Sequence, residues 1–538
     1  MQRLVTALLL AATALIGVAH AAFLPPWEGF DETAHWSYIQ ELSDTGHPPH
    51  YGVDGIARDI DAYPGPMTYS GAPPFEKTGR PTYRSFAQAD APSIVGGPRR
   101  YAGNGSPNWQ AQHPPLYYAA MVPVYRASRG LGWLNHLLVL RLASFALAFA
   151  GFAIGVIATA RWAERRGEGG APGPWTGPIM AAWPFLFPQF FPQFARLGND
   201  SLCLLLMGAA WALLLRLLAD APRRGDWFAA AALGGVLGLG LLTKAFFLPI
   251  GAGIGVMLLA RAVLSRRPAD FGQAVLAGLI ALAIGGWWYG LKRLETGSFT
   301  GSDEFIRLNH GGAMAQLADG FSAAELVRGL GQIIATFVWA GTWSLARLPE
   351  ILLIPPIALL GLCLVDYLRT LVRALRDLRP RSQLGPGLIA FAPLALAVPM
   401  AAGLIYHVFV WMAGASAATP GWYFHILAAP LGLAVAIGWR RPLLLGALAA
   451  LTGLYTLLAW SFQLSMFSGC AAKLGEDKHY NLHDAGCFID PRALVALGHP
   501  TLGVLSLGLG LTLLALAFAL CARAFAPQAP VCVELAAL

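Results

Sequence analysis

The chain has 538 residues, of which 56% are hydrophobic and 12% are charged, and its mean hydropathy is +0.55. A soluble domain carries about twice that share of charged residues, so the composition excludes an ordinary soluble enzyme. The net charge of +8 comes from basic residues that gather beside apolar stretches, where membrane orientation rules place them. No compact basic domain is left over to bind nucleic acid.

Apolar stretches of about 20 residues, long enough to cross about 30 Å of hydrocarbon, recur along the whole sequence. They predict an all-α polytopic membrane protein with about 12 transmembrane helices. The predicted spans lie near residues 4–24, 133–160, 176–194, 200–218, 227–243, 245–263, 271–290, 350–368, 385–411, 423–439, 443–466 and 500–523. The segment near 327–346 is an ambiguous further one.

Arginines cluster after every second predicted span. They are Arg161, Arg165, Arg166, Arg223, Arg224, Arg266, Arg267, Arg369, Arg373, Arg376, Arg379, Arg381, Arg440 and Arg441. Short basic loops face the cytoplasm, so both termini are expected inside and the long loops outside.

This topology divides the chain into five parts. They are a first span over 1–24, an extracytoplasmic loop over 25–132, a helical core over 133–466 with an outer loop at about 291–349, a second extracytoplasmic loop over 467–499, and a last span with a cytoplasmic tail over 500–538. The first part also reads as a secretory signal that ends in Ala-His-Ala before Ala22. We expect it to be retained as a span, because it would anchor the motif that follows.

Two smaller patterns carry structural expectations. Gly234 with Gly238, and Gly251 with Gly255, form GxxxG pairs that predict close helix packing. Cys470 and Cys487 flank the polar loop after the eleventh span, and they are expected to form a disulfide if that loop faces an oxidising compartment.

The stretch "FLPPWEGFDETAHWSYIQEL" (23–42) places acidic residues directly after an apolar span. If a helix runs over 28–42, Glu28, Asp31, Glu32 and His35 share one face, while its tryptophans and tyrosine suit the aromatic belt of a membrane. Three interpretations stay open. The acids cap the helix and face water, they do chemistry, or Asp31 and His35 bind a metal with help from a later histidine, His47 or His50.

The acidic stretch, continued as "PPWEGFDETAHWSYIQELSDTGHPP", resembles the first extracytoplasmic loop of the GT-C superfamily of membrane glycosyltransferases, which use sugars carried on a polyprenyl phosphate. Further short motifs follow in the family's order, each at the outer end of a span. They are "QHPPLYYAAMVPVY" (112–125), "RLGNDSL" (196–202), "LLTKAFFLP" (241–249), "FVWAGTWSLARLP" (337–349) and "TPGWYFHILAAP" (419–430). The resemblance covers roughly 25–430, and it is closest to a largely uncharacterised bacterial family.

The resemblance implies an inverting transfer of a monosaccharide to an envelope glycan, lipid or protein on the outer side of a bacterial inner membrane. Asp31 is the expected catalytic base, and Glu32 is expected to assist it. Such a reaction also needs cations that stabilise the departing phosphate. The expected substrate-binding residues are His35, His113, Arg196, Asp200, Lys244, Lys292, Arg293 and Arg347. The sugar, the acceptor and a divalent cation stay open, and no protein metal ligands are assigned.

Lys244 is the strongest of these cations, because a lysine within an apolar run is costly unless it has a partner; the alternative is snorkelling to the interface. Asn199 is expected to cap the fourth span. Trp422 stands where the family tends to have an arginine, which weakens any phosphate contact there. Two rival functions remain, a transporter or lipid flippase and a non-enzymatic envelope scaffold. A transporter is expected to show polar residues or broken helices at the middle of the membrane.

Overall fold

The computed structural model describes residues 1–50, 52–63, 100–165, 173–219, 225–297, 299, 322–343, 350–377, 384–412, 420–439, 442–467, 473–474, 479–480 and 499–525. Among these residues, 10 helices are long and apolar enough to cross a membrane, and two further apolar helices, Asp226–Leu241 and Leu326–Val338, are shorter. The chain is therefore an all-α polytopic membrane protein, as the sequence predicts.

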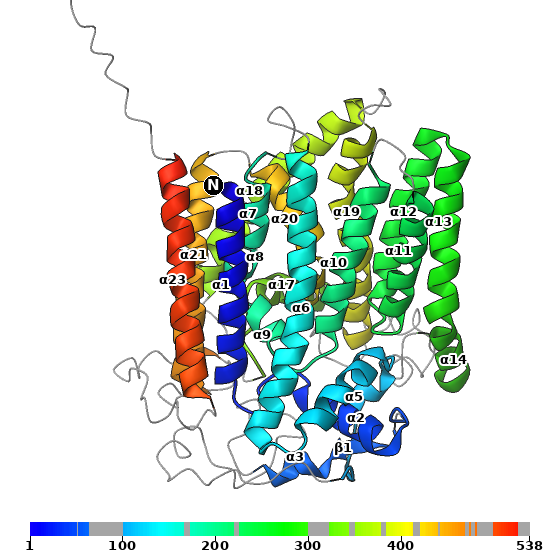
Figure 1. Cartoon of the computed structure of the whole chain (residues 1–538), viewed down its shortest axis with the longest axis vertical. Helices are drawn as coiled ribbons and strands as arrows, with labels where there is room; N and C mark the ends of the chain where they lie inside the picture. The colour runs from blue at the N-terminus through cyan, green and yellow to red at the C-terminus, as the bar shows by residue number, and fades with distance from the viewer. Residues whose placement is uncertain are drawn as a thin grey trace, which may run out of the picture.

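Long helices run side by side and form the main body of the molecule (Figure 1). They are α1 (Gln2–Phe23), α6 (Trp133–Glu164), α10 (Asp200–Leu217), α11 (Asp226–Leu241), α12 (Phe247–Ser265), α13 (Pro268–Ala281), α18 (Glu350–Asp377), α19 (Leu384–Met412), α20 (Ala428–Gly438), α21 (Pro442–Phe467) and α23 (Pro500–Phe525). Shorter segments continue some of them or fill the interior. They are the π-helix η2 (Leu282–Gly286), α14 (Trp287–Thr296), α17 (Ala323–Val338) and the 3₁₀ helix η4 (Gly421–Leu427).

The span predicted over 176–194 is not one continuous helix. It consists of α7 (Thr176–Ala181), α8 (Trp183–Leu186) and α9 (Phe190–Phe194), which follow one another down the body in Figure 1. Prolines at 178, 184, 188 and 192 explain the breaks, because each proline removes a backbone donor and its ring clashes with the preceding turn. The last of these short helices ends just before Arg196.

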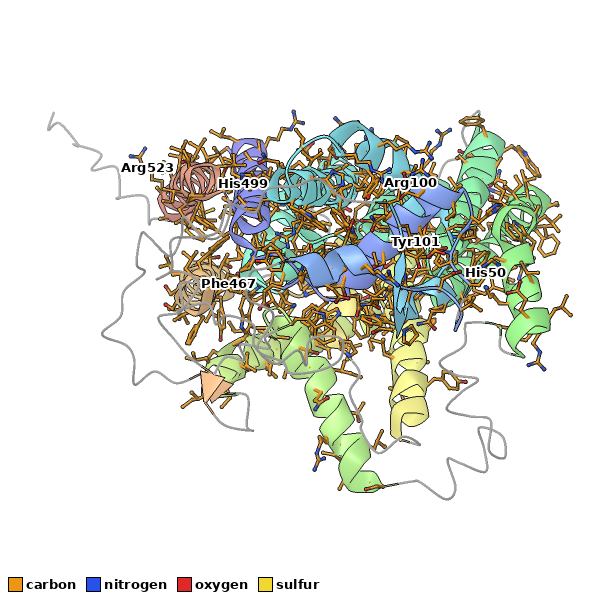
Figure 2. All side chains as sticks on the ribbon, turned by 90° about the horizontal axis from the view of Figure 1, so that it is seen from below. His50, Arg100, Tyr101, Phe467, His499 and Arg523 are labelled. Carbon is orange, nitrogen blue, oxygen red and sulfur yellow. The ribbon has the colours of Figure 1, made fainter. Side chains whose placement is uncertain are left out.

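A small cap covers one end of the helices and consists of described residues within 25–63 and 100–128. Its elements are α2 (Glu32–Thr45), β1 (Gly55–Ala57), α3 (Arg58–Ala62), β2 (Gly103–Pro107), η1 (Trp109–Gln112) and α5 (Leu116–Ser128). The two strands pair antiparallel, with Gly55 opposite Pro107 and Ala57 opposite Gly103. Seen from the cap side, the blue helix α2 lies across the helical body, and His50 and Tyr101 lie near one of its ends (Figure 2).

Aromatic packing fixes the cap onto α6. Trp36 stacks on Trp133 at 4.8 Å between ring centroids, and Trp27 meets both rings edge-on. Tyr38 stacks on Tyr118 of α5 at 3.5 Å. The expectation that Trp27, Trp36 and Tyr38 face the lipid boundary is therefore wrong, since all three are buried within the protein. They serve as the cap's own core.

Helix α1 is a core element, packed against α23, α6 and α7. Val5, Ala12 and Ile16 are completely buried, and a Cβ at Gly17 would overlap the ring of Phe145. At its start, Arg3 forms two hydrogen bonds of 2.9 Å with Glu164 at the end of α6. Retention of this segment in the mature chain stays a prediction, and the burial of α1 supports it.

The two GxxxG pairs behave differently. At Gly234 and Gly238 a Cβ would collide with Ala277 and Ile284, so α11 and the α13–η2 segment approach closely there, as predicted. Gly251 and Gly255 have open space where a Cβ would lie, and the close-packing expectation is wrong for them. On α12 it is Gly253, between the two, that packs against the backbone of α19 at Ala395. The face of the helix, rather than the spacing, decides which glycine is used.

Candidate functional site

The acidic stretch begins with a turn and not with the predicted helix over 28–42. Helix α2 starts at Glu32, and Asp31 occupies the N-cap position with a left-handed backbone, φ 58°. Trp27 is also left-handed, with φ 67°. Glu28 and Asp31 therefore precede the helix, and the shared face of four residues is wrong. A left-handed aspartate cannot be read from sequence, because glycine is the usual occupant of this conformation.

Asp31 lies half-buried at the junction of the cap and the helical body. Its Oδ1 accepts a hydrogen bond of 2.8 Å from Trp109 Nε1. Burial raises the pKa of the Asp31 carboxyl above its ordinary value, while Arg196, the Trp109 hydrogen bond and Lys244 oppose that rise. A raised pKa makes a carboxylate a stronger base than one in water.

Three charged side chains beside Asp31 form what we call the charged cluster: Arg196, Asp200 and Lys244. Asp200 Oδ2 lies 2.9 Å from Arg196 Nη2, and Asp200 Oδ1 lies 2.7 Å from Lys244 Nζ. All three are buried. The snorkelling alternative for Lys244 is therefore wrong, because its ammonium is inside the protein. Two cations and one carboxylate leave a formal charge of +1 (2 − 1) on the cluster.

The cluster is joined directly to the turn that carries Asp31. Arg196 Nη1 donates a hydrogen bond of 2.5 Å to the backbone oxygen of Phe30. Arg196, Lys244 and Asp200 also act electrostatically on the Asp31 carboxyl. Residues 165 or more positions apart in the chain thus meet at one place, where the ends of α9, α10 and α11 reach the cap.

Several polar atoms around the cluster are buried without a hydrogen-bond partner. They are Arg196 Nε, the amide oxygen and nitrogen of Asn199, and Gln193 Oε1. Asn199 occupies the N-cap position of α10, as expected, but its side chain makes no hydrogen bond to the helix. The expected capping bond is therefore absent. Buried polar atoms normally find partners. Unpaired ones beside a net positive charge are suited to a polar, anionic ligand.

Aromatic rings line the other side of the cluster. The Lys244 ammonium lies 4.7 Å from the ring centroid of Phe246 and 4.8 Å from that of Tyr423, which favours its charged form by cation–π attraction. Trp422 stacks on Phe30 at 4.2 Å between ring centroids. The position after Gly421 therefore contributes an aromatic wall and no cation.

Both predicted histidines lie near the cluster, and both are neutral. Burial, followed by the charges of Arg196 and Lys244, holds the pKa of His35 well below its usual range. Burial and Lys244 lower the pKa of His113 to about 3. His35 Nδ1 also lies 3.0 Å from Tyr118 Oη. Neither histidine can add positive charge for a phosphate at neutral pH, so any substrate contact from them would be a neutral hydrogen bond.

Glu32 lies in a different environment from its neighbour Asp31. Its carboxylate is bound by Arg141, with Nε 2.7 Å from Oε1 and Nη2 2.5 Å from Oε2. Sequence reasoning missed Arg141, although a single arginine inside the apolar span 133–160 is as costly as the lysine that was noticed. Its partner is 109 positions away, and no local spacing indicates that pairing.

Lys292 and Arg293, two of the remaining predicted cations, do not join the cluster. Lys292 and Arg293 lie on α14, which extends from the far edge of the body in Figure 1. Lys292 pairs with Glu295 on the same helix at 2.9 Å, and Arg293 is exposed and lies over the ring of Phe299. Arg347 lies outside the described residues, as do Cys470 and Cys487, so their phosphate contact and disulfide stay predictions.

The metal interpretation gains no support from the part of the chain that the structure describes. Within it, no group of three His, Cys, Asp or Glu side chains is placed to hold a metal ion. His50 instead approaches Asp54, with Nδ1 3.3 Å from Oδ2, and His35 is occupied by Tyr118.

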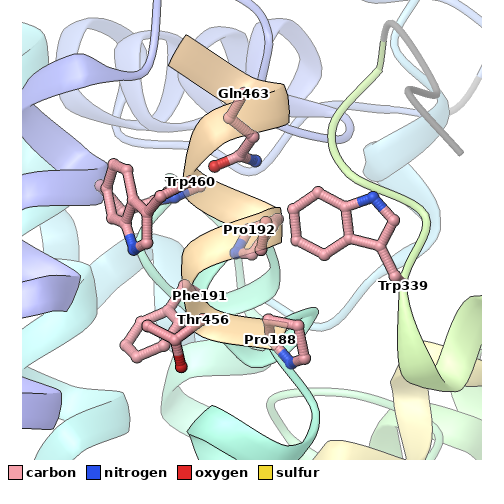
Figure 3. Close-up of a pocket in the computed structure, with 9 residues that line it drawn as sticks. Pro188, Phe191, Pro192, Trp339, Thr456, Trp460 and Gln463 are labelled. Atoms are coloured by element: carbon pink, nitrogen blue, oxygen red, sulfur yellow. The ribbon is translucent and has the colours of Figure 1, made fainter. Parts of the chain in front are cut away.

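A small cavity lies apart from Asp31, between α1, α8–α9, α21 and the end of α17 (Figure 3). Trp339, Trp460 and Phe191 supply much of its wall. His20 Nε2 and Gln463 Nε2 are buried there without hydrogen-bond partners. A water molecule would satisfy such atoms. The cavity shares the α9 segment with the charged cluster, but none of its lining residues belongs to that cluster.

Comparison with known proteins returns a fold likeness only. No protein family matches the chain, and no curated protein matches it either. Two crystal structures of ArnT from Cupriavidus metallidurans are similar, at 13% sequence identity. The apo structure gives a TM-score of 0.44 over 95% of this chain and 76% of ArnT. The structure bound to undecaprenyl phosphate gives 0.42 over 95% and 77%. An identity of 13% transfers no residue role to this chain.

Proposed function

We propose that this protein is a GT-C-type glycosyltransferase that moves a monosaccharide from a polyprenyl-phosphate donor to an acceptor hydroxyl at the cap end of the membrane. One observation carries the proposal. Asp31, the Arg196–Asp200 pair and Lys244 come from three separate motifs that resemble the family, and they meet in one place. A chance likeness of short motifs would not be expected to converge in space.

Asp31 acts as the general base in this proposal. The acceptor oxygen attacks the anomeric carbon, the bond from that carbon to the phosphate oxygen breaks, and Asp31 takes the acceptor's proton. With Oδ1 held by Trp109, Oδ2 is available for the hydroxyl. A single displacement inverts the anomeric configuration and needs one base only. General-base catalysis of this kind contributes about 10²–10⁴-fold in rate.

The charged cluster binds the phosphate. Its two cations, with the unpartnered Arg196 Nε–H, would meet a ligand that gains negative charge as the sugar leaves. Buried cations act strongly on such a charge because water does not screen them. Asp200 is the bridge that holds both cations in place and not a second acid, since Arg196, Lys244 and Gln193 Nε2 already occupy its oxygens.

The transporter alternative draws on one observation, the broken helix α7–α9. Its breaks coincide with prolines. Of its two glutamines, Gln189 accepts from Ala340 N at 2.6 Å and Gly341 N at 2.9 Å, and Gln193 donates to Asp200 of the charged cluster. The titratable cluster lies instead at the cap end, which favours chemistry at the membrane surface over passage through its middle.

The test uses purified full-length protein in lipid nanodiscs with radiolabelled polyprenyl-phosphate sugars and a membrane extract as acceptor. We expect label to leave the polyprenyl phosphate in a protein-dependent way. Transfer of lipid between leaflets of proteoliposomes without cleavage would favour the flippase, and the absence of both activities would favour the scaffold. The acceptor class follows from which extract fraction gains label.

A further inference from the structure

The turn before α2 is held in a conformation that its own residues disfavour. Trp27 and Asp31 are two of the three non-glycine residues with positive φ in the described part of the chain. A bulky side chain such as that of Trp27 avoids this region, and aspartate adopts it only occasionally, so the surroundings must enforce the conformation of the turn. The next residue, Glu32, and its partner Arg141 supply that enforcement.

The Glu32 carboxylate is bound on every side. Oε2 accepts from Trp27 N at 3.2 Å and Oε1 from Leu197 N at 3.2 Å, in addition to the two bonds from Arg141. The Glu32 side chain is 0% exposed and that of Arg141 is 4% exposed. No lone pair is left for a substrate proton, so Glu32 is not placed to act on substrate.

Arg141 uses its other N–H groups to hold the start of the same turn. Nη2 donates to Pro25 O at 2.9 Å, and Nη1 donates to Leu24 O. One guanidinium on α6 therefore ties the end of α1 to the first residue of α2. The planar fork of arginine suits such multiple contacts, and a lysine ammonium does not reproduce them.

These bonds fix both halves of the site. On one side, the turn places Asp31 directly before Glu32. On the other, Leu197 N is bound by Glu32 while the adjacent Arg196 donates to Phe30 O. We propose that Glu32 and Arg141 are a positioning pair, which sets the Asp31 carboxylate against the Arg196 guanidinium without touching substrate. This inference rests on the proposed function and replaces the catalytic role expected for Glu32.

Arg141→Lys tests the pair while keeping its charge. Because a misplacement of about 1 Å costs up to about 10²-fold in rate, we expect kcat to fall about 10–100-fold. The donor KM should stay within about twofold. The acid limb of the pH–rate profile should also stay in place, since Arg141 does not contact Asp31. Glu32→Asp, which shortens the acid by one methylene, should give the same pattern.

Arg261→Lys is the matched control. Arg261 and Asp270 form another buried pair, 7% and 4% exposed, at the end of α12 and the start of α13, away from the cap. The same substitution at Arg261 should leave kcat unchanged. This result would show that the effect at Arg141 is specific to that residue and is not a general consequence of replacing a buried arginine.

The outcomes are distinguishable. No transfer by the wild-type protein refutes the proposed function and this inference with it. Wild-type transfer with an unchanged kcat in folded Arg141→Lys overturns the positioning role alone. A rise in donor KM at constant kcat also overturns it, because it indicates direct substrate binding. If neither Arg141→Lys nor Glu32→Asp folds, the pair is a folding element and the inference is wrong.

Discussion

Two buried ion-pair regions flank the Phe30–Glu32 turn, and they differ in what they leave unsatisfied. In the Glu32–Arg141 pair, both carboxylate oxygens are bound by the arginine and by backbone N–H groups. In the charged cluster of Arg196, Asp200 and Lys244, two cations share one carboxylate, and Arg196 Nε has no partner. Arginine and carboxylate groups thus satisfy each other's hydrogen bonds in the Glu32–Arg141 pair. In the charged cluster they leave a positive charge and an unpartnered N–H that a ligand could use.

Structural and functional charges inside a membrane protein can be separated by this difference. Burying a charge is costly in both regions, so burial alone does not mark a site. Three features together mark a functional site. They are a net charge left on the buried groups, polar atoms without hydrogen-bond partners, and a neighbouring titratable group whose pKa is shifted. Asp31 and the charged cluster meet all three conditions, whereas Glu32 and Arg141 balance each other.

The largest expected effect comes from removing the base. Asp31→Asn keeps the size of the side chain and the Trp109 hydrogen bond but removes proton-accepting power, so turnover should fall about 10²–10⁴-fold. Steady-state transfer assays measure this, with thermal unfolding to establish that the fold is intact. Near-normal turnover would mean that Asp31 is not the base. The functional difference proposed between the charged cluster and the Glu32–Arg141 pair would then lose its support.

The next effect tests the leftover charge. Lys244→Met removes one cation, and because a hydrogen bond to a charged group contributes about 1.5–3 kcal/mol, donor affinity should weaken about 10–100-fold. Lys244→Arg should retain part of that affinity, since it keeps the charge but alters the geometry. Donor titrations at fixed acceptor check both variants. An unchanged donor dependence in Lys244→Met would mean that Lys244 serves Asp200 alone.

A smaller effect concerns the Asp31 pKa. Trp109 stabilises the charged carboxylate by donating to it, so Trp109→Phe should raise the already elevated pKa of Asp31 further. Because the base must be deprotonated, activity would be lost at a higher pH on the acid side. The dependence of kcat/KM on pH measures this limb. A limb that stays fixed or moves to lower pH contradicts the assignment of Asp31 as base.

The smallest effect is expected outside both regions. Lys292 and Arg293 lie on α14, and the double variant Lys292→Gln, Arg293→Gln should keep turnover and donor affinity within about twofold. Sequence position alone suggested these residues as phosphate partners, whereas the structure places them on a helix away from the cluster. A donor-specific loss in the double variant would show that the charged cluster is incomplete without them.

Sequence reasoning predicted the fold class and singled out Asp31, Arg196, Asp200 and Lys244, which the structure brings together. Long apolar runs require helices, and a lysine such as Lys244 in an apolar run demands a partner. It could not find what the partner was, because Asp200 and Lys244 are 44 positions apart. It could not foresee the left-handed Asp31 either, and a helix started four residues too early gave Glu28 and Asp31 a helical face that they lack. Glu32 was expected to be catalytic because it adjoins Asp31 in the sequence. The hydrogen bonds that fill its carboxylate come from residues distant in the chain, chiefly Arg141, and the sequence does not indicate them.

The most direct test of the central claim is equilibrium binding of a polyprenyl phosphate without sugar to the wild-type protein, Asp31→Asn and Lys244→Met, measured beside transfer activity. We expect opposite behaviour in the two variants. Asp31→Asn should bind at least as tightly as the wild type, because it loses a negative charge near the phosphate, yet fail to transfer sugar. Lys244→Met should bind about 10–100-fold more weakly. Equal binding in all three proteins, or equal loss in both variants, would contradict the division between a base at Asp31 and a phosphate site at the charged cluster.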